Sequence, residues 1–340
     1  MEQIVTQITS SRYHFRRIGL VVAIAALIVL AVRPALALLN TPPEFLPAQA
    51  SVPVAPAGAG LASAVMTGLD EPMPTINDFP DLRVTAALVK ELGAAKPLFV
   101  YHPSARWPLA SVSKLMTAVV ALDDLGPATI LTVSQSAVDT EGVAGGLKAG
   151  EKYSVIDLVR AMLTVSSNDA AMVLAEAYDA KHLDKEAYER AINKTALFTA
   201  AMQQKARDLG MSETYYGDPS GLSVVNQSII TDLEALTNHI VASHPELLEI
   251  TRKKENKVLE RRTMTWHILP NINQLAGQAD FLGGKTGETE EAGGNLLSLF
   301  KYNGKQYLII VLGTESAASR FTETTKLYEW LKTGIMKYEL

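Results

Sequence analysis

The 340-residue chain contains no cysteine. Disulfide bonds, thiolate metal sites, a cysteine nucleophile and a lipid-modified N-terminal cysteine are therefore excluded. Histidine is also scarce: the chain has six, and no two of them have the HExxH spacing of a helical zinc site. We therefore expect neither a metal ion nor another cofactor.

Basic residues are too few to balance the acidic ones. The chain has 31 Lys and Arg against 36 Asp and Glu, a formal net charge of −5. Residues 1–39 contain four of the basic residues and one of the acidic residues, so the remainder carries a net charge of −8. An acidic body argues against nucleic acid as a partner. Hydrophobic residues make up 48% of the chain, which is typical of a globular protein.

One uncharged apolar run, residues 18–32, lies near the N-terminus and follows a basic flank. This run is shorter than the roughly 20 residues that span a bilayer, unless it continues to Leu39 across Arg33 and Pro34. A basic flank before a short apolar run is typical of an export signal. We expect residues 1–39 to be a signal anchor or, alternatively, a cleaved signal peptide; a buried core helix is the third interpretation. The basic flank consists of Arg12, Arg16 and Arg17.

On either export interpretation the basic end stays in the cytoplasm, and the rest of the chain lies on the extracytoplasmic side of the membrane. Residues 40–81 are rich in proline and alanine. They predict an extended linker, with irregular domain surface as the alternative. We expect the folded domain at residues 82–340.

The order of the expected elements indicates an α+β fold. Residues 83–91 and 96–102 read as strands joined by a turn, and residues 294–314 read as a hairpin around Asn303-Gly304. Mostly helices are expected between them, and a closing helix after them. We expect an antiparallel sheet built from both ends of the domain, with a mostly helical insertion. One expected helix begins near Ser111, and another is capped by Thr231. The others cover residues 154–163, 168–178, 185–210 and 320–335.

The stretch "PLASVSKLMTA" contains a serine, Ser111, three residues before a lysine, Lys114. Residues i and i+3 of a helix share a face, so the lysine amine can reach the serine hydroxyl. A lysine serves as a base when burial or neighbouring cations lower its pKa. The apolar surroundings of Lys114 favour such burial. The alternative is an ordinary helix cap followed by a surface lysine.

Two further triplets have polar side chains suited to a cleft. Ser166 and Asn168 lie two residues apart between two expected helices, although both residue types are also common helix caps. Lys285, Thr286 and Gly287 stand among glycines before the hairpin. This pattern suits a strand that binds an anionic carboxylate, with a glycine-rich loop as the alternative.

In the order Ser-x-x-Lys, Ser-x-Asn, Lys-Thr-Gly, these triplets form the signature of penicillin-interacting serine enzymes. With the flanking "RWPLASVSKLMTA", "LKAGEKYSVIDLVRAMLTVSSNDAA" and "GDPSGLS", residues 82–340 resemble the low-molecular-mass penicillin-binding proteins. These are the D-alanyl-D-alanine carboxypeptidases and endopeptidases of serine peptidase family S11. The resemblance implies a serine β-lactamase/transpeptidase-like fold and a place in the bacterial cell envelope.

The resemblance also implies catalytic roles. Ser111 would be the nucleophile that forms an acyl-enzyme with the carbonyl between two D-alanines, and Lys114 its general base. Ser166 would relay a proton to the leaving amine, and Asn168 would hold the peptide. Peptidoglycan stem peptides would be the substrates, and β-lactam antibiotics would act as acylating inhibitors.

Substrate binding would fall to four consecutive residues. Lys285 and Thr286 would bind the terminal carboxylate beside the bare backbone of Gly287. The backbone N–H groups of Glu288 and Ser111 would form the oxyanion hole. Glu288 departs from the family, in which a bulky or aromatic residue is more usual at this position. It places acid at the mouth of the cleft and leaves the leaving-group preference open.

Function is expected to be that of a D-Ala-D-Ala carboxypeptidase, with endopeptidase cleavage of peptidoglycan cross-links as the alternative. The 53 residues after Gly287 leave no room for the extra C-terminal domain of larger carboxypeptidases, which favours the endopeptidase branch. A non-catalytic, membrane-tethered wall or β-lactam sensor is a third interpretation. No Glu-x-x-Leu-Asn motif lies between Asn168 and Lys285, so fast β-lactam hydrolysis is not expected.

Overall fold

The computed structural model describes residues 80–142 and 145–338. The export segment expected at 1–39 and nearly all of the linker expected at 40–81 lie outside these ranges. Within the described ranges, no helix combines the length and the apolar character needed to cross a membrane.

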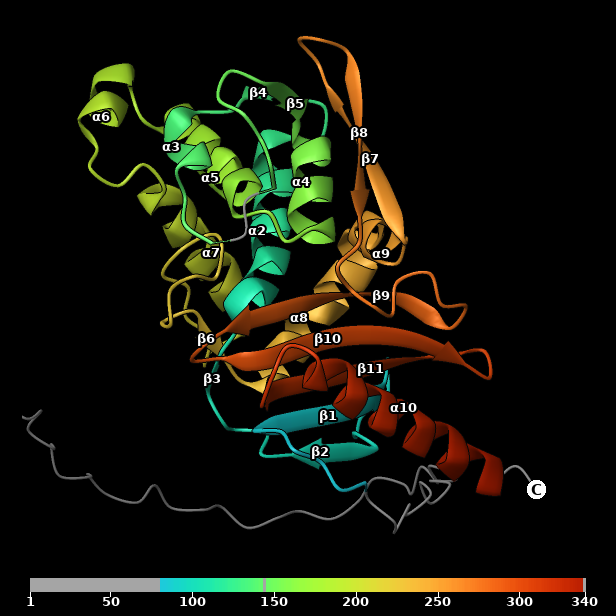
Figure 1. Cartoon of the computed structure of the whole chain (residues 1–340). Coiled ribbons are helices and arrows are strands. Elements are labelled where there is room, and N and C mark those ends of the chain that lie inside the picture. The colour runs from blue at the N-terminus through green and yellow to red at the C-terminus, as the bar shows by residue number, and fades with distance from the viewer. Residues whose placement is uncertain (1–79, 143–144, 339–340) are drawn as a thin grey trace, which may run out of the picture. The chain divides into compact units, whose positions relative to one another are not determined.

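A five-stranded antiparallel sheet joins the two ends of the described chain (Figure 1). Its strand order is β2-β1-β11-β10-β9. The first two strands come from the start of the domain and the other three from its end. This arrangement confirms the predicted α+β fold with a helical insertion. The strands are β1 (Ala86–Glu91), β2 (Phe99–Tyr101), β9 (Phe281–Thr289), β10 (Gly293–Tyr302) and β11 (Lys305–Thr314).

The predicted hairpin turn joins β10 to β11. Asn303 and Gly304 have φ angles of 46° and 78°, the left-handed conformation that a tight hairpin requires. Leu297 pairs with Ile310 and faces the helices, whereas Leu296 pairs with Val311 and faces the opposite side of the sheet. Side chains therefore alternate between two cores, as the two-residue period of a strand dictates.

Helices cover the two faces of the sheet unequally. One face packs against α10 (Ser319–Tyr338), and the other against a larger helical lobe. The lobe contains the 3₁₀ turn η1 (Ala110–Ser113) and the helices α2 (Lys114–Leu125), α3 (Gln135–Val138), α4 (Val155–Thr164), α5 (Asn168–His182), α6 (Lys185–Arg190), α7 (Ala196–Asp208), α8 (Ile230–Ser243) and α9 (Pro245–Thr251).

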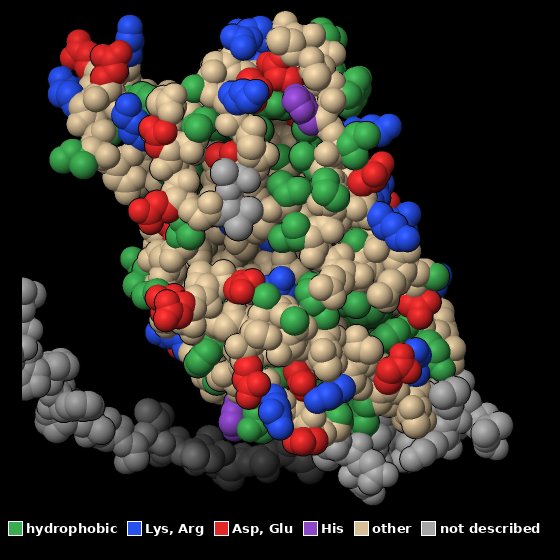
Figure 2. All heavy atoms as spheres, viewed as in Figure 1, with side chains coloured by type: hydrophobic (Ala, Val, Ile, Leu, Met, Phe, Trp, Pro, Cys, Tyr) green, Lys and Arg blue, Asp and Glu red, His purple; other side chains and the backbone are tan. Residues whose placement is uncertain are grey.

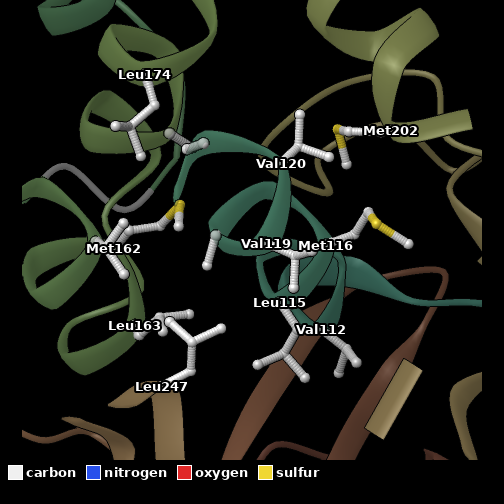
Figure 3. Packing of buried hydrophobic residues seen from close by; sticks show 14 of the residues in the cluster. Val112, Leu115, Met116, Val119, Val120, Met162, Leu163, Leu174, Met202 and Leu247 are labelled. Atoms are coloured by element: carbon white, nitrogen blue, oxygen red, sulfur yellow. The ribbon is translucent and has the colours of Figure 1, made fainter. Parts of the chain in front are cut away.

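Helix α2 runs through the centre of the helical lobe. Its apolar side chains meet those of α4, α5, α7 and α9 (Figure 3). Nearly every residue of α2 is buried, including the charged Lys114. Helix α6, in contrast, has no buried residue, and its acidic and basic side chains face solvent (Figure 2). The packing around most of α2 fixes the position of the residues at its start.

Three two-stranded sheets complete the described fold. One of them, the sheet of β7 and β8, is a hairpin along α4 (Figure 1) that was not predicted from the sequence. The pairs are β3 (Trp107–Pro108) with β6 (Gln227–Ser228), β4 (Ile130–Thr132) with β5 (Lys152–Ser154), and β7 (Glu255–Glu260) with β8 (Thr265–Pro270).

Two helix predictions need correction. The helix expected over residues 185–210 is divided into α6 and α7 by residues 191–195. Thr231 does not cap a helix: α8 begins at Ile230, and its N-cap residue is Ile229, which makes no side-chain capping bond. The buried side chain of Ile230 fixes the start of α8 through packing rather than through a polar cap.

Candidate active site

Ser111 and Lys114 meet where η1 passes into α2. Lys114 is the first residue of α2, and its Nζ lies 2.8 Å from the Ser111 Oγ. Ala110 has a φ of 48°, a conformation that L-residues rarely adopt. Gly221 packs so closely against this turn that a Cβ there would lie 1.9 Å from the Ala110 carbonyl oxygen. The neighbouring loop thus holds the backbone that presents Ser111.

The Lys114 amine is fully buried and surrounded by oxygen atoms. Besides Ser111 Oγ, it contacts the Asn168 Oδ1 at 2.7 Å and the Ser220 carbonyl oxygen at 2.5 Å. Burial lowers the pKa of Lys114 to about 7, and the charges of Asp218 and Asp169 partly oppose this effect. Near neutral pH a large share of the amine is therefore unprotonated, and its lone pair can accept the Ser111 proton.

The Ser166–Asn168 triplet lies at the start of α5. Ser166 has a φ of 60°, so the triplet is a left-handed turn rather than an extended segment. Ser167 caps α5, because its Oγ accepts a hydrogen bond from the Ala170 N–H at 3.0 Å. The capping alternative is thus correct for the middle residue, while the two outer side chains point to the lysines.

Asn168 is engaged within the protein at both ends of its amide. Its Oδ1 accepts from Lys114, and its Nδ2 donates to the Glu141 carbonyl oxygen at 2.9 Å. This geometry makes Asn168 a positioning residue for Lys114. One amide hydrogen is left for a peptide, the partner that the sequence analysis expected.

Lys285 reaches the site from strand β9 of the sheet. Its Nζ donates to the Ser166 Oγ at 3.0 Å and to the Thr286 carbonyl oxygen at 2.8 Å. The side chain is 1% exposed. Burial, together with the cations of Lys114 and Arg320, holds the pKa of Lys285 well below its usual range. Ser166 and Lys285 are therefore joined by a direct hydrogen bond, along which a proton can pass.

Strand β9, which contains Lys285 to Glu288, is the outer strand of the sheet. The Gly284 N–H points off this free edge, because it donates to the Thr251 Oγ1 at 3.1 Å. Alternate residues of a strand point their N–H groups to the same side, so the Glu288 N–H faces the free edge as well. A Cβ at Gly287 would lie 2.5 Å from the Leu109 carbonyl oxygen. β9 therefore lies directly against the turn that contains Ser111.

A loop that the sequence analysis did not assign supports Lys114. The Asp218 carboxylate accepts the N–H groups of Ser220, Gly221 and Ser223 at 2.6–2.7 Å. These bonds fold the loop so that the Ser220 carbonyl oxygen reaches Lys114. This loop is the "GDPSGLS" segment, residues 217–223, and no residue type in it reveals this role.

Arg320, from α10, was also missed. Its guanidinium donates to the Gly287 carbonyl oxygen at 3.1 Å and forms an ion pair with Glu288 at 3.5 Å. The Arg320 Nε is buried and has no hydrogen-bond partner among the described residues. Glu288 was expected to place acid at the cleft mouth; its side chain is exposed and lies against this cation. A sequence offers no signal for such a contact between distant elements.

The structure thus brings the predicted site residues into one cluster. Ser111 and Lys114 form one contact within it, Ser166 and Lys285 another, and Asn168 touches Lys114. Thr286, Gly287 and Glu288 continue the strand beside them. The residues of the whole cluster are Ser111, Lys114, Ser166, Asn168, Lys285, Thr286, Gly287 and Glu288.

Comparison with known proteins gives a consistent result. The family model Peptidase_S11, described as D-alanyl-D-alanine carboxypeptidase, matches residues 73–316. A D-alanyl-D-alanine endopeptidase from Pseudomonas aeruginosa is 32% identical over 75% of this chain and 79% of its own length. The Escherichia coli protein of the same name is 28% identical over 84% of this chain and 86% of its own length. The carboxypeptidase DacA of Haemophilus influenzae is 26% identical over 74% of this chain but 62% of its own length.

Solved structures share the fold. Penicillin-binding protein D2 from Listeria monocytogenes, in its ampicillin-bound form, is 31% identical, with a TM-score of 0.60. The alignment covers 74% of this chain and 99% of that one. A mutant of the Streptomyces K15 DD-transpeptidase aligns with a TM-score of 0.66 at 22% identity, over 76% of this chain and all of its own. The second likeness confirms the transpeptidase-like fold.

Proposed function

The chain belongs to the Peptidase S11 family, and from this premise we propose that it is a serine DD-endopeptidase that hydrolyses D-alanyl cross-links between peptidoglycan stem peptides. The observation that carries the serine mechanism is the 2.8 Å contact between Ser111 and a fully buried Lys114 whose pKa is lowered to about 7. A hydroxyl beside a partly neutral amine is an activated nucleophile.

Acylation begins at Ser111. Its Oγ attacks the D-alanyl carbonyl carbon while its proton passes to the Lys114 Nζ. The negative charge on the carbonyl oxygen is stabilised by the N–H groups of Ser111 and Glu288. The free-edge direction of the Glu288 N–H supports this assignment. The backbone around Ser111 is held by Gly221, which favours a preorganised oxyanion hole.

Departure of the leaving amine needs a proton. Ser166 donates its hydroxyl proton to the amine as the C–N bond breaks, and Lys285 returns a proton to Ser166 across their 3.0 Å contact. Water then attacks the ester. The proton that the water releases passes through Ser166 to Lys285 and replaces the one given to the amine. The Ser111 oxygen regains its proton from Lys114, so both lysines return to their starting states.

Recognition of the leaving side falls to β9 and α10. Lys285 and Thr286 line the strand next to Gly287 and Glu288. The guanidinium of Arg320 lies near Lys285 and lowers its pKa. A carboxylate on the leaving side of the scissile bond would be attracted by this guanidinium and would accept hydrogen bonds from the Lys285 amine. Both a terminal D-alanine and a cross-linked diamino acid bear such a carboxylate.

The choice of endopeptidase over carboxypeptidase rests on chain coverage. Two relatives named endopeptidases match over 79% and 86% of their own lengths. The carboxypeptidase DacA matches over 62% of its length. Carboxypeptidase activity is the second candidate, favoured by the description of the family model. A sensor without turnover is disfavoured because all the chemical groups are present.

Several wider assignments follow as part of the proposal. We assign the peptidase activity to residues 82–340, and we assign export and membrane attachment to residues 1–39. The enzyme would work on the extracytoplasmic side of a bacterial membrane. β-Lactams would acylate Ser111, in line with the ampicillin complex of the Listeria protein.

The test uses the full chain with two purified substrates, cross-linked muropeptide dimers and monomeric pentapeptides, and mass spectrometry of the products. Conversion of dimers to monomers is expected. Ser111→Ala should lower turnover by about 10⁴-fold or more, because the nucleophile is lost. Ser104→Ala, the same chemical change at an exposed turn, should leave turnover unchanged.

The product pattern decides between the alternatives. Loss of one alanine from pentapeptides, with intact dimers, would replace the endopeptidase by a carboxypeptidase. Stable labelling by penicillin without turnover of either substrate would replace both by a sensor. Turnover that persists in Ser111→Ala would overturn the serine mechanism itself.

A further inference from the structure

Asp123, His239 and His244 come together on the helical lobe, apart from the serine cluster. Each offers one ligand atom, and these atoms lie within 4.8 Å of one another. Asp123 lies on α2, nine residues after Lys114, which corresponds to about 14 Å along the helix. His239 lies on α8, and His244 lies between α8 and α9. The residues come from separate elements, which is why their spacing in the sequence gave no metal signal.

Two of the three groups are oriented by neighbours outside the cluster. The His244 Nδ1 lies 3.3 Å from the Glu246 Oε1, and its Nε2 lies 3.0 Å from the Asp123 Oδ1. Lys205 donates to the other oxygen of Asp123, Oδ2, at 2.7 Å. Metal-binding histidines and carboxylates are commonly oriented by such hydrogen bonds to the atom that does not bind the metal. The atoms of these two residues that remain available to a metal ion are His244 Nε2 and Asp123 Oδ1.

The third group, His239, supplies an independent observation. Its Nε2 is buried and has no hydrogen-bond partner among the described residues. Its ring packs edge-on against that of His244, with the centroids 5.6 Å apart. A buried polar atom without a partner is unfavourable. A cation held jointly with His244 and Asp123 would satisfy this nitrogen.

We propose that Asp123, His239 and His244 bind Zn²⁺. Two imidazole nitrogens and one carboxylate oxygen are ligands that zinc accepts in a tetrahedral site. Metal–ligand bonds of about 2.0–2.1 Å place the ligand atoms about 3.4 Å apart, so small side-chain rotations close the site. Water would fill the fourth position. Asp123 is exposed, so the site can be reached from solvent.

The proposed ion would have a structural role. It would join α2, the helix that begins with Lys114, to the corner between α8 and α9. A ligand that binds the folded state and not the unfolded state raises stability by mass action. We therefore expect zinc to raise the melting temperature, and the readout does not depend on peptidase activity.

The test is a zinc titration of the metal-free full chain by calorimetry, with thermal melting and, after replacement of zinc by Co²⁺, visible absorption. One equivalent of Zn²⁺ should bind and raise the melting temperature. His239→Ala and Asp123→Asn should abolish this rise. Glu246→Gln should weaken binding about 10- to 100-fold, because it removes an outer contact.

His182→Ala is the matched control. His182 faces Asp124 at 3.4 Å, a similar pair one residue further along α2, but no third ligand accompanies it among the described residues. This variant should keep the full zinc response. Absence of a one-to-one zinc response in the unmodified chain would overturn the proposal. A response that survives both His239→Ala and Asp123→Asn would overturn it too, because the zinc would then bind elsewhere.

Discussion

At the scale of single residues, the protonation state of Lys114 controls the proposed chemistry. Burial lowers the pKa of this amine to about 7. The protonated form has no lone pair to accept the Ser111 proton, so acylation requires the neutral form. Below pH 7 the neutral fraction falls about tenfold for each pH unit. The second-order rate constant for acylation by penicillin should therefore rise about tenfold per unit up to pH 7 and level off above it.

Lys114→Arg separates this explanation from a general effect of pH on the fold. A guanidinium stays charged throughout the range, so the variant should lose acylation at every pH tested while melting as a folded protein. A wild-type rate constant that stays flat between pH 5 and pH 8 would show that Lys114 is not the base.

The residues around Lys114 mark the limit of what sequence can predict at this scale. The spacing of Ser111 and Lys114 predicted that the two side chains can meet, but it left a helix cap followed by a surface lysine as the alternative. Asp218 and Arg320 were missed because each acts through a loop or helix distant in the chain. Their carboxylate and guanidinium give no local pattern that distinguishes them from surface charges.

At the scale of elements, the loop that contains Gly221 and the turn that contains Ser111 are in tight contact. Gly221 has a φ of +85°, and a Cβ there would lie 1.9 Å from the Ala110 carbonyl oxygen and 3.1 Å from the Ser111 backbone nitrogen. Gly221→Ala should therefore displace the nucleophile. A shift of about 1 Å at a reacting group can cost about 100-fold, which we expect in the acylation rate constant.

Gly93→Ala provides the control for this variant. Gly93 has nearly the same φ, +84°, but nothing lies within 4 Å of its missing Cβ. The substitution should lower the free energy of unfolding by about 1 kcal/mol through backbone strain alone and leave acylation unchanged. Equal acylation rates in the two variants would contradict the positioning role of the Gly221 loop.

Elements with a strong periodic pattern were predicted well, and those defined by packing were not. The hairpin around Asn303-Gly304 and the strands β1 and β2 lie where the sequence placed them. The β7–β8 hairpin was missed, because its aliphatic residues stand side by side, as Val258-Leu259 and Ile268-Leu269, instead of alternating with polar residues. Ser166 was expected between two helices, but no local pattern predicted its left-handed backbone conformation, with a φ of 60°.

At the scale of the whole molecule, the active-site strand belongs to a sheet that both ends of the domain must complete. β9 is supported by β10, β10 by β11, and β11 by β1 from the start of the domain. Strand β9 therefore needs the whole sheet, including the strands from the start of the domain, to hold its residues in the active site. Helix α10 begins at Ser319, after the family match ends at residue 316, yet it covers one face of this sheet.

Deletion of α10 should consequently prevent folding rather than only weaken the site. Among its described side chains, five apolar ones are buried in the core on this face of the sheet, each contributing about 2 kcal/mol. Their sum, about 10 kcal/mol, is similar to the whole stability of a typical domain. A chain that ends at Glu315 should show no cooperative melting transition and no penicillin labelling. The five side chains are Phe321, Leu327, Tyr328, Trp330 and Leu331.

A chain that ends at Gly334 tests whether packing, rather than chain length, is responsible. It keeps all five buried side chains as well as Arg320, so it should melt cooperatively and react with penicillin at nearly the rate of the full chain. Circular dichroism melting and labelling of both truncated chains give the answer. If the chain ending at Glu315 folded and lost only its reactivity, α10 would act chiefly through Arg320, and the sheet would be stable without its second cover.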